Sequence, residues 1–163
     1  MKLNGMHIIA LSFTGMFIIP IYAGKELFTI RSEAGRGSFL EPSKNIEWST
    51  VRHRSQAENE TPKLWEIEKL EDGLYRITCD GMALTVVDDK EWSDVQLGVY
   101  NGWKSQHWKI EAMESGHFMI THANGLVLTG PNKTDDLITE VASSQGWSTQ
   151  KWIIESFEVV GSD

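Results

Sequence analysis

The stretch QKWIIE, residues 150–155, is the last of three similar segments in this chain. The other two are KLWEIE at residues 63–68 and QHWKIE at residues 106–111, so each segment contains Trp-x-Ile-Glu. The three tryptophans, Trp65, Trp108 and Trp152, lie 43 and 44 residues apart. A fixed period of this length indicates a fold built from repeated structural units.

A second marker recurs at nearly the same interval. An aromatic residue stands two positions before an isoleucine in FTI at 28–30, YRI at 75–77 and FMI at 118–120, with spacings of 47 and 43 residues. A turn signal follows each pair: Ala34-Gly35, Asp80-Gly81 and Asn124-Gly125. Asp-Gly and Asn-Gly favour two-residue hairpins, because both central positions of that turn have positive φ. Each copy is therefore predicted to open with a β-hairpin.

Apolar residues alternate with others along the second copy, as they do in strands. The alternating positions are Met82, Leu84 and Val86, then Val95, Leu97 and Val99. No helical period competes with this pattern. We expect an all-β domain with three four-stranded units, at about 24–70, 71–113 and 114–160. Packing around a pseudo-threefold axis would bring the three tryptophans into one core, where each large aromatic removes roughly 150–250 Å² from water.

The first 23 residues differ from the rest and predict a secretory signal peptide. Lys2 precedes an apolar run from Ile8 to Tyr22, and Ala23 offers a small residue for cleavage. Pro20 interrupts the run, which also falls short of the ~20 apolar residues that a membrane-spanning helix needs. We therefore expect one secreted domain, residues 24–163, with no membrane attachment after cleavage.

Composition limits the partners of this domain. The chain has 15 Lys and Arg against 23 Asp and Glu, a net charge of −8, and loss of Lys2 with residues 1–23 makes it −9. Such a charge repels phosphate backbones, so nucleic acid is not an expected partner. The single cysteine excludes a disulfide within the chain. Sequons at Asn59 and Asn132 are candidate glycosylation sites.

The segments Gln106-His107-Trp108 and Gln150-Lys151-Trp152 resemble the Gln-x-Trp motif of the R-type, or ricin B-like, β-trefoil lectins. The first copy departs from the motif, because Lys63 replaces the glutamine. The resemblance implies a β-trefoil that binds glycans. In that family an aspartate after the first hairpin, an aromatic ring in the following loop and a polar residue near Gln-x-Trp hold the sugar. This chain has Thr85 and Thr129 where the aspartate is expected.

Other residues of the same two copies could hold a sugar instead. Asp88 and Asp89 follow Thr85 closely, and Trp92 or Tyr100 could supply a stacking ring. In the third copy, Asp136 belongs to a similar polar stretch. Trp103 and Trp147 lie in parallel Gly-Trp segments five residues before the motif tryptophans, where they could either bind sugar or fold back over the end of the barrel. The candidate carbohydrate-binding residues are Asp88, Trp92, Tyr100, Trp103, Gln106, Asn132, Asp135, Trp147 and Gln150.

A second resemblance gives an alternative function. WEIEKLEDGLYRI, residues 65–77, is similar to the corresponding strand and turn of fungal β-trefoil protease inhibitors, which block a protease with one exposed loop. The longest loop predicted here runs from Pro42 to Pro62, and it is either disordered or functional. Arg52, His53 and Arg54 would present a basic residue of this loop to a secreted, trypsin-like protease. A third alternative is a protein–protein interaction trefoil whose sugar sites have decayed.

No constellation of residues predicts catalysis. The histidines left after cleavage, His53, His107, His117 and His122, do not have metal-ligand spacing. Cys79 shares strand alternation with inward-facing residues, so we expect a buried and inert thiol. We therefore expect a non-enzymatic protein without a metal or cofactor.

Overall fold

The computed structural model describes residues 26–34, 38–55, 60–131 and 137–157. The predicted signal peptide, both sequon asparagines (Asn59 and Asn132) and Asp135 lie outside these residues. Within the described part of the chain, no helix has the length and apolar character needed to cross a membrane. The regular structure of the described chain is almost all strand, as the alternating sequence predicts, with two short 3-10 turns besides.

Each unit contributes its strands in chain order. Unit 1 holds β1 (Leu27–Ser32), β2 (Phe39–Pro42), β3 (Val51–Arg54) and β4 (Trp65–Lys69). Unit 2 holds β5 (Tyr75–Cys79), β6 (Met82–Val86), β7 (Ser93–Val99) and β8 (Trp108–Ala112). Unit 3 holds β9 (Phe118–His122), β10 (Val127–Thr129), β11 (Leu137–Ile138), β12 (Glu140–Ala142) and β13 (Trp152–Phe157). The described residues thus form thirteen strands rather than twelve, because Thr139 interrupts the third strand of unit 3.

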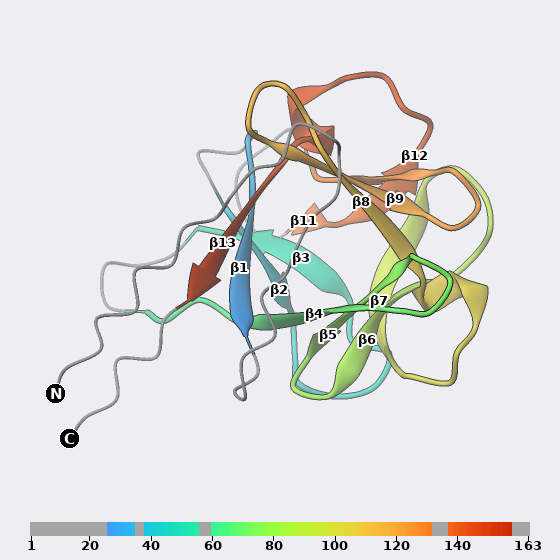
Figure 1. The fold of residues 1–163 in the computed structure, drawn as a ribbon. Helices are drawn as coiled ribbons and strands as arrows, with labels where there is room; N and C mark the ends of the chain where they lie inside the picture. The colour runs from blue at the N-terminus through green and yellow to red at the C-terminus, as the bar shows by residue number, and fades with distance from the viewer. Residues whose placement is uncertain (1–25, 35–37, 56–59, 132–136, 158–163) are drawn as a thin grey trace, which may run out of the picture.

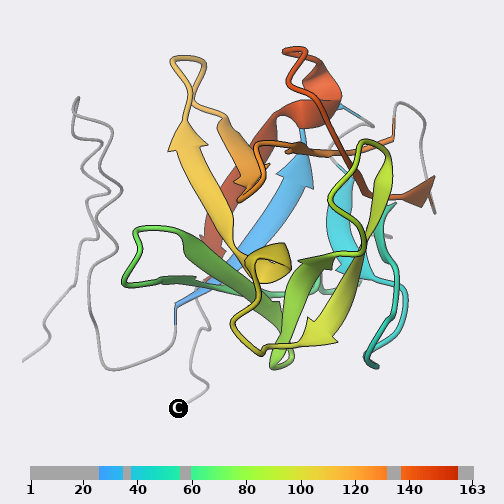
Figure 2. The same ribbon diagram turned by 90° about the vertical axis from the view of Figure 1, so that its right-hand side faces the viewer.

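Six strands close into a barrel and the others cover one end of it. Antiparallel pairing runs β1–β4–β5–β8–β9–β13 and returns to β1. The first and last strands of the fold therefore lie side by side, as the blue and red arrows of Figure 1 show. In Figure 2, strands from early, middle and late parts of the chain surround the same interior. The hairpins β2–β3, β6–β7 and β10–β12 form the cap, and the whole is a β-trefoil.

The three motif tryptophans have equivalent positions in the core, as predicted from the period. Trp65, Trp108 and Trp152 are each fully buried in one hydrophobic cluster. Each indole Nε1 donates to a leucine carbonyl of the cap hairpin in its own unit, at 2.9, 2.9 and 3.0 Å. These carbonyls belong to Leu40, Leu84 and Leu128. The interior thus repeats faithfully from unit to unit.

The Asp80-Gly81 and Asn124-Gly125 turns differ in conformation. Asp80 and Gly81 have φ of 49° and 82°, so this hairpin has the predicted two-residue turn. In the Asn124-Gly125 turn only Gly125 has positive φ, at 96°, and the turn closes more widely through a His122 N to Leu126 O bond of 2.7 Å. The prediction of a two-residue turn was wrong there. The Asn124 side chain accepts a hydrogen bond from Leu126 N at 3.0 Å, which stabilises the wider turn.

The stretch from Pro42 to Pro62 is not the single long loop that the sequence predicts. Its residues 51–54 form β3, which pairs with β2 and β11. Arg52 and Arg54 therefore lie in a strand, and His53 is 1% exposed, with Nδ1 3.2 Å from Ser38 Oγ. Burial removes His53 from contact with a protease, and a paired strand replaces the long loop that was predicted around Arg52 and Arg54, although the Arg54 side chain is itself exposed.

Candidate functional site

The glutamines of both Gln-x-Trp motifs are internal scaffold residues. Gln106 is buried, and its Oε1 accepts a hydrogen bond from Asn101 N at 2.9 Å. Its Nε2 donates to Val99 O at 2.8 Å and to Thr85 Oγ1 at 3.3 Å. Gln150, also buried, makes the equivalent bonds in unit 3 with Gln145 N, Ser143 O and Thr129 Oγ1. These amide groups are occupied inside the protein, so we leave Gln106 and Gln150 out of the candidate site.

The positions that the lectin resemblance assigns to sugar aspartates are closed. Thr85 and Thr129 are buried, and each hydroxyl donates at 2.8 Å to a carbonyl of its own strand, Ala83 O and Val127 O. In unit 2 the opposite strand carries Gly98, and a Cβ there would lie only 2.9 Å from Thr85 Oγ1. The expected place for a bound sugar is thus taken up by packing between β6 and β7.

Unit 1 has a carboxylate at the corresponding position, but it faces inward. Glu41 follows Leu40 as Thr85 follows Leu84, and it is 9% exposed. Its Oε1 accepts a hydrogen bond from Lys63 N at 3.3 Å. The carboxylate therefore helps to hold the residue that replaces the motif glutamine, instead of being presented to solvent.

Two Gly-Trp loops place indole rings outside the barrel. Gly102 and Gly146 have φ of 79° and 70°, a region that favours glycine. The following tryptophans, Trp103 and Trp147, are extended and precede single turns of 3-10 helix that carry the motif glutamines inward. Trp103 is 62% exposed and Trp147 is 44% exposed. Neither ring is buried against the barrel.

The loop between β6 and β7 brings a second indole next to Trp147. Trp92 is 53% exposed, and its N donates to Val141 O of unit 3 at 2.7 Å. The Trp92 and Trp147 rings are nearly parallel, with centroids 6.2 Å apart and an interplanar angle of 20°. We call this exposed pair the Trp92–Trp147 platform. It joins one loop from unit 2 to one from unit 3, residues that are far apart in sequence.

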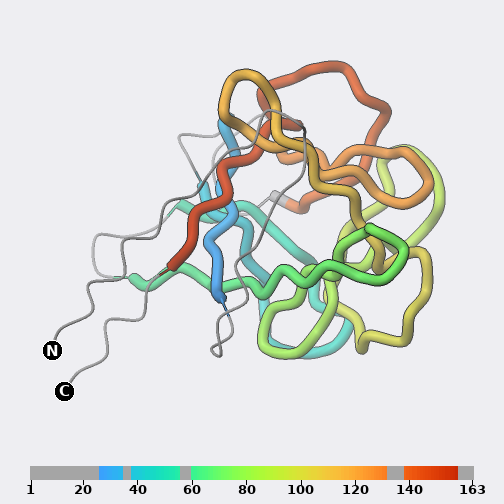
Figure 3. Tube along the Cα trace, in the orientation of Figure 1, coloured from blue at the N-terminus to red at the C-terminus, as the bar shows by residue number. Residues whose placement is uncertain are grey.

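Polar side chains of the same loop border the platform. Glu91 Oε1 accepts a hydrogen bond from Ser143 N at 2.9 Å, and its bonds with Ser143 hold the pKa of Glu91 below its usual value. Asp89 Oδ1 accepts from Asn124 Nδ2 at 3.3 Å, so the loop lies beside the β9–β10 turn, as the yellow-green and orange segments of Figure 3 show. Asp88 is exposed and pairs with Lys90 at 2.7 Å. The border is therefore polar and mainly acidic.

Tyr100 is not available as a stacking ring. The Arg76 guanidinium lies 4.5 Å from its ring centroid, and the Tyr100 hydroxyl is 3.2 Å from His107 Nε2. The His107 ring stacks with Tyr100 at a centroid distance of 6.1 Å. Because its neighbours already cover the ring, Tyr100 does not join the platform.

The sequence interpretation missed one exposed tryptophan, Trp48, which is 56% exposed. It lies 44 residues before Trp92, and a serine follows both, as Ser49 and Ser93. Trp48 and Trp92 also share a φ of 63°, which is rare for a residue other than glycine. The repeated Trp-Ser pair at the period of the fold was the signal that could have identified Trp48.

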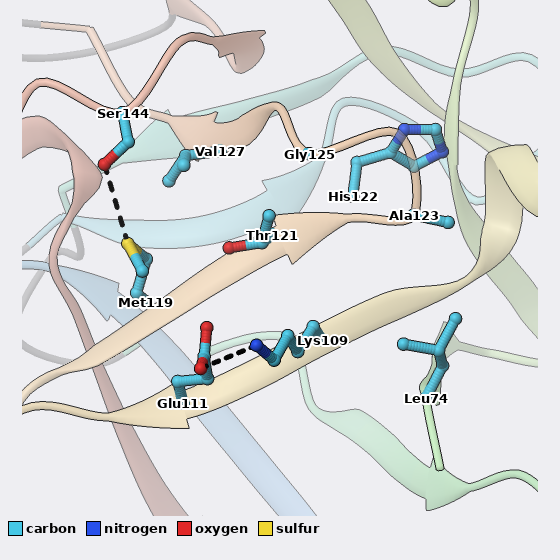
Figure 4. A pocket seen from close by; sticks show the side chains of 10 residues that line it. All are labelled: Leu74, Lys109, Glu111, Met119, Thr121, His122, Ala123, Gly125, Val127 and Ser144. Atoms are coloured by element: carbon cyan, nitrogen blue, oxygen red, sulfur yellow. Dashed lines mark hydrogen bonds and ion pairs between the residues drawn. The ribbon is translucent and has the colours of Figure 1, made fainter. Parts of the chain in front are cut away.

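A pocket of about 340 Å³ opens between units 2 and 3 beside the β9–β10 turn. Figure 4 shows Met119, Thr121 and Val127 from strands of unit 3 along it, with Lys109 paired to Glu111 at 2.8 Å on β8. No tryptophan, tyrosine or phenylalanine is among the described residues that line this pocket. Its charged groups neutralise each other, and it contains none of the sequence-predicted site residues.

Two titratable side chains of the core have strongly shifted pKa values. Cys79 is 1% exposed, and burial raises the pKa of its thiol to about 12, in agreement with the predicted inert cysteine. Burial lowers the pKa of His53 to about 4. Among the residues that the structure describes, no three His, Cys, Asp or Glu side chains gather as a metal site would require.

The likeness of this chain to known proteins is one of fold. No protein-family model matches the sequence, and no curated protein does. The designed threefold-symmetric protein ThreeFoil superposes with a TM-score of 0.71 at 20% identity, covering 78% of this chain and 96% of that one. These values confirm the β-trefoil.

Two lectins give similar superpositions. For the Polyporus squamosus lectin, solved with Neu5Acα2-6Galβ1-4GlcNAc bound, the TM-score is 0.69 at 18% identity, over 83% of this chain and 50% of that one. For the agglutinin from Abrus precatorius the TM-score is 0.63 at 18% identity, over 82% of this chain and 50% of that one. This chain therefore spans half the length of either lectin chain.

Proposed function

We propose that this protein is a secreted, non-enzymatic glycan-binding trefoil whose binding surface is the Trp92–Trp147 platform. The observation that carries the proposal is the pairing of two large, nearly parallel aromatic rings that stay about half exposed at the boundary between two units. The trefoil lectins among the structural neighbours support glycan as the ligand class.

The platform combines the two kinds of contact that sugars need. A pyranose ring has an apolar face of C–H groups that packs on an aromatic face, while its hydroxyls require polar partners. At the platform the indoles of Trp92 and Trp147 supply the first kind. Exposed carboxylates and the exposed amide group of Asn124 supply the second from the adjoining loop and turn.

The charge of the border favours uncharged sugars. The segment 88–91 carries Asp88, Asp89 and Glu91 against one basic residue, Lys90, a net charge of −2. The domain as a whole is acidic as well. Carboxylate or sulfate groups on a glycan would be repelled at this boundary. The proposed ligand class is therefore a neutral oligosaccharide.

A glycan array probed with the mature protein, residues 24–163, tests this proposal. Binding to neutral glycans is expected, and Trp92→Ala or Trp147→Ala should each weaken binding at the Trp92–Trp147 platform at least tenfold, a loss of about 1.4 kcal/mol or more. Val87→Ala is the matched control, because Val87 lies in the same loop and is exposed but carries no ring. It should leave binding unchanged.

The proposal fails if the wild-type protein gives no signal on the array. It also fails if binding persists unchanged in a Trp92→Ala, Trp147→Ala double variant that melts cooperatively like the wild type. Binding restricted to another protein instead of glycans would favour the interaction trefoil with decayed sugar sites.

A further inference from the structure

The loop that carries Trp92 has a close structural counterpart in unit 1. In residues 43–49, Lys44 N donates to Ser49 Oγ at 2.8 Å, and Ser49 N donates to Ile46 O at 3.2 Å. In residues 87–93 the same bonds join Asp88 N to Ser93 Oγ at 2.8 Å and Ser93 N to Lys90 O at 3.3 Å. The two loops therefore share one backbone framework.

Each of these loops docks on the next unit in the same way. Trp92 N donates to Val141 O of unit 3 at 2.7 Å, and Trp48 N donates to Leu97 O of unit 2 at 2.8 Å. Leu97 and Val141 lie 44 residues apart, at equivalent places in their units. Trp48 therefore stands at the boundary of units 1 and 2 as Trp92 stands at the boundary of units 2 and 3.

The partner ring of the platform is repeated as well. Trp103 and Trp147 have nearly the same backbone conformation, with φ and ψ of −70° and 149° against −64° and 151°. Gln106 N donates to Trp103 O and Gln150 N donates to Trp147 O, both at 2.9 Å. The loop of unit 2 that carries Trp103 is thus oriented in its unit as the loop that carries Trp147 is oriented in unit 3.

The two tryptophans of a boundary are present together or absent together. The boundary of units 1 and 2 has Trp48 and Trp103, and that of units 2 and 3 has Trp92 and Trp147. At the third boundary the corresponding sequence positions hold Asp136, 44 residues after Trp92, and Glu60, 43 residues before Trp103. If each ring only covered the end of the barrel, its presence at a boundary would not depend on the presence of the second tryptophan there.

We infer that Trp48 and Trp103 form a second binding platform for the same class of neutral glycan, so that one chain binds two ligands. This inference rests on the proposed function of the first platform. Trp48 and Trp103 are 56% and 62% exposed, more than the stacked pair. The second platform is therefore the more open of the two, and a ligand that lies across it would contact both exposed rings.

Fluorine NMR of the protein labelled with 5-fluorotryptophan tests the inference ring by ring. The chain has seven tryptophans, four exposed and three buried, and single substitutions assign their signals. Four neutral tetrasaccharides are titrated separately: lacto-N-tetraose, cellotetraose, maltotetraose and chitotetraose. With at least one of them, the Trp48 and Trp103 signals should shift together, as should those of Trp92 and Trp147.

Two variants separate the platforms. In Trp92→Ala the Trp147 shift should disappear while the Trp48 and Trp103 shifts remain, and in Trp48→Ala the pattern should reverse. Ile46→Ala, an exposed residue of the same loop as Trp48, is the matched control and should change neither pattern. Shifts confined to Trp92 and Trp147 would overturn the second platform and leave the proposed function intact. If no tetrasaccharide shifts any exposed ring, both proposals are overturned.

Discussion

The seven tryptophans of this chain fall into two groups that differ in burial and in how regularly they repeat. The three in the core are fully buried, and each donates to a leucine carbonyl in an environment that repeats in every unit. The four on the loops are 44–62% exposed and occur at only two of the three unit boundaries. The interior keeps threefold symmetry because the three units pack against one another there. The loops face solvent, so their residues can differ from unit to unit.

Among these tests, truncation of a core tryptophan should have the largest effect on the free energy of unfolding. Trp108→Ala removes a buried indole and leaves the Leu84 carbonyl without its partner, so the free energy of unfolding should fall by about 3–5 kcal/mol. Urea unfolding followed by circular dichroism measures the loss. Trp108→Phe, which keeps most of the apolar volume, should lose clearly less. Equal losses for the two variants would contradict a packing role for this ring.

His53 should make the folded protein less stable in acid. Because burial lowers its folded pKa from 6.5 to about 4, the unfolded chain binds a proton in this interval and the folded protein does not. The stabilising contribution is therefore complete above pH 6.5 and is lost as the pH falls toward 4. The loss amounts to ~3 kcal/mol at about 1.4 kcal/mol per pH unit.

The repeat itself supplies the control for His53. Leu97 occupies the equivalent position of unit 2, 44 residues later. His53→Leu should remove most of the slope between pH 4 and 6.5 in urea unfolding measured at several pH values. A slope identical to that of the wild type would show that other groups cause the acid sensitivity.

Truncation of a loop tryptophan should have the smallest effect on stability. Trp92→Ala changes a side chain that is more exposed than buried, so the free energy of unfolding should change by no more than about 0.5 kcal/mol, although the proposed glycan binding at the Trp92–Trp147 platform is weakened. Thermal melting of Trp92→Ala beside Trp108→Ala makes the comparison directly. A loss above 2 kcal/mol in Trp92→Ala would mean that the loop rings are structural.

The sequence predicts the repeating parts of the molecule well. The spacing of Trp65, Trp108 and Trp152 identifies the units, and the alternation around Cys79 identifies it as a core residue. β3 escaped prediction because its inward positions are Val51 and His53, and a histidine between two arginines does not resemble a strand core. Inside the fold the His53 ring packs against Trp152 of unit 3, with ring centroids 5.2 Å apart, and the sequence of unit 1 alone does not show this contact.

The contacts that decide the candidate site could not be predicted from one unit at a time. Thr85 is closed off because Gly98 on the neighbouring strand lets β7 approach it. The pairing of Trp92 with Trp147 requires loops of two units to meet, which neither loop alone encodes. Trp48, by contrast, was open to prediction, because its spacing from Trp92 matches the period of the fold.

The φ of 63° at Trp48 and Trp92 has an evolutionary consequence. An L-residue in this region carries a conformational cost of roughly 1–2 kcal/mol that glycine does not. A mutant library sorted only for heat resistance should therefore accumulate glycine at both positions, whereas one sorted for ligand capture should retain tryptophan. Stability thus favours glycine at these two backbone positions, whereas the proposed ligand binding favours tryptophan.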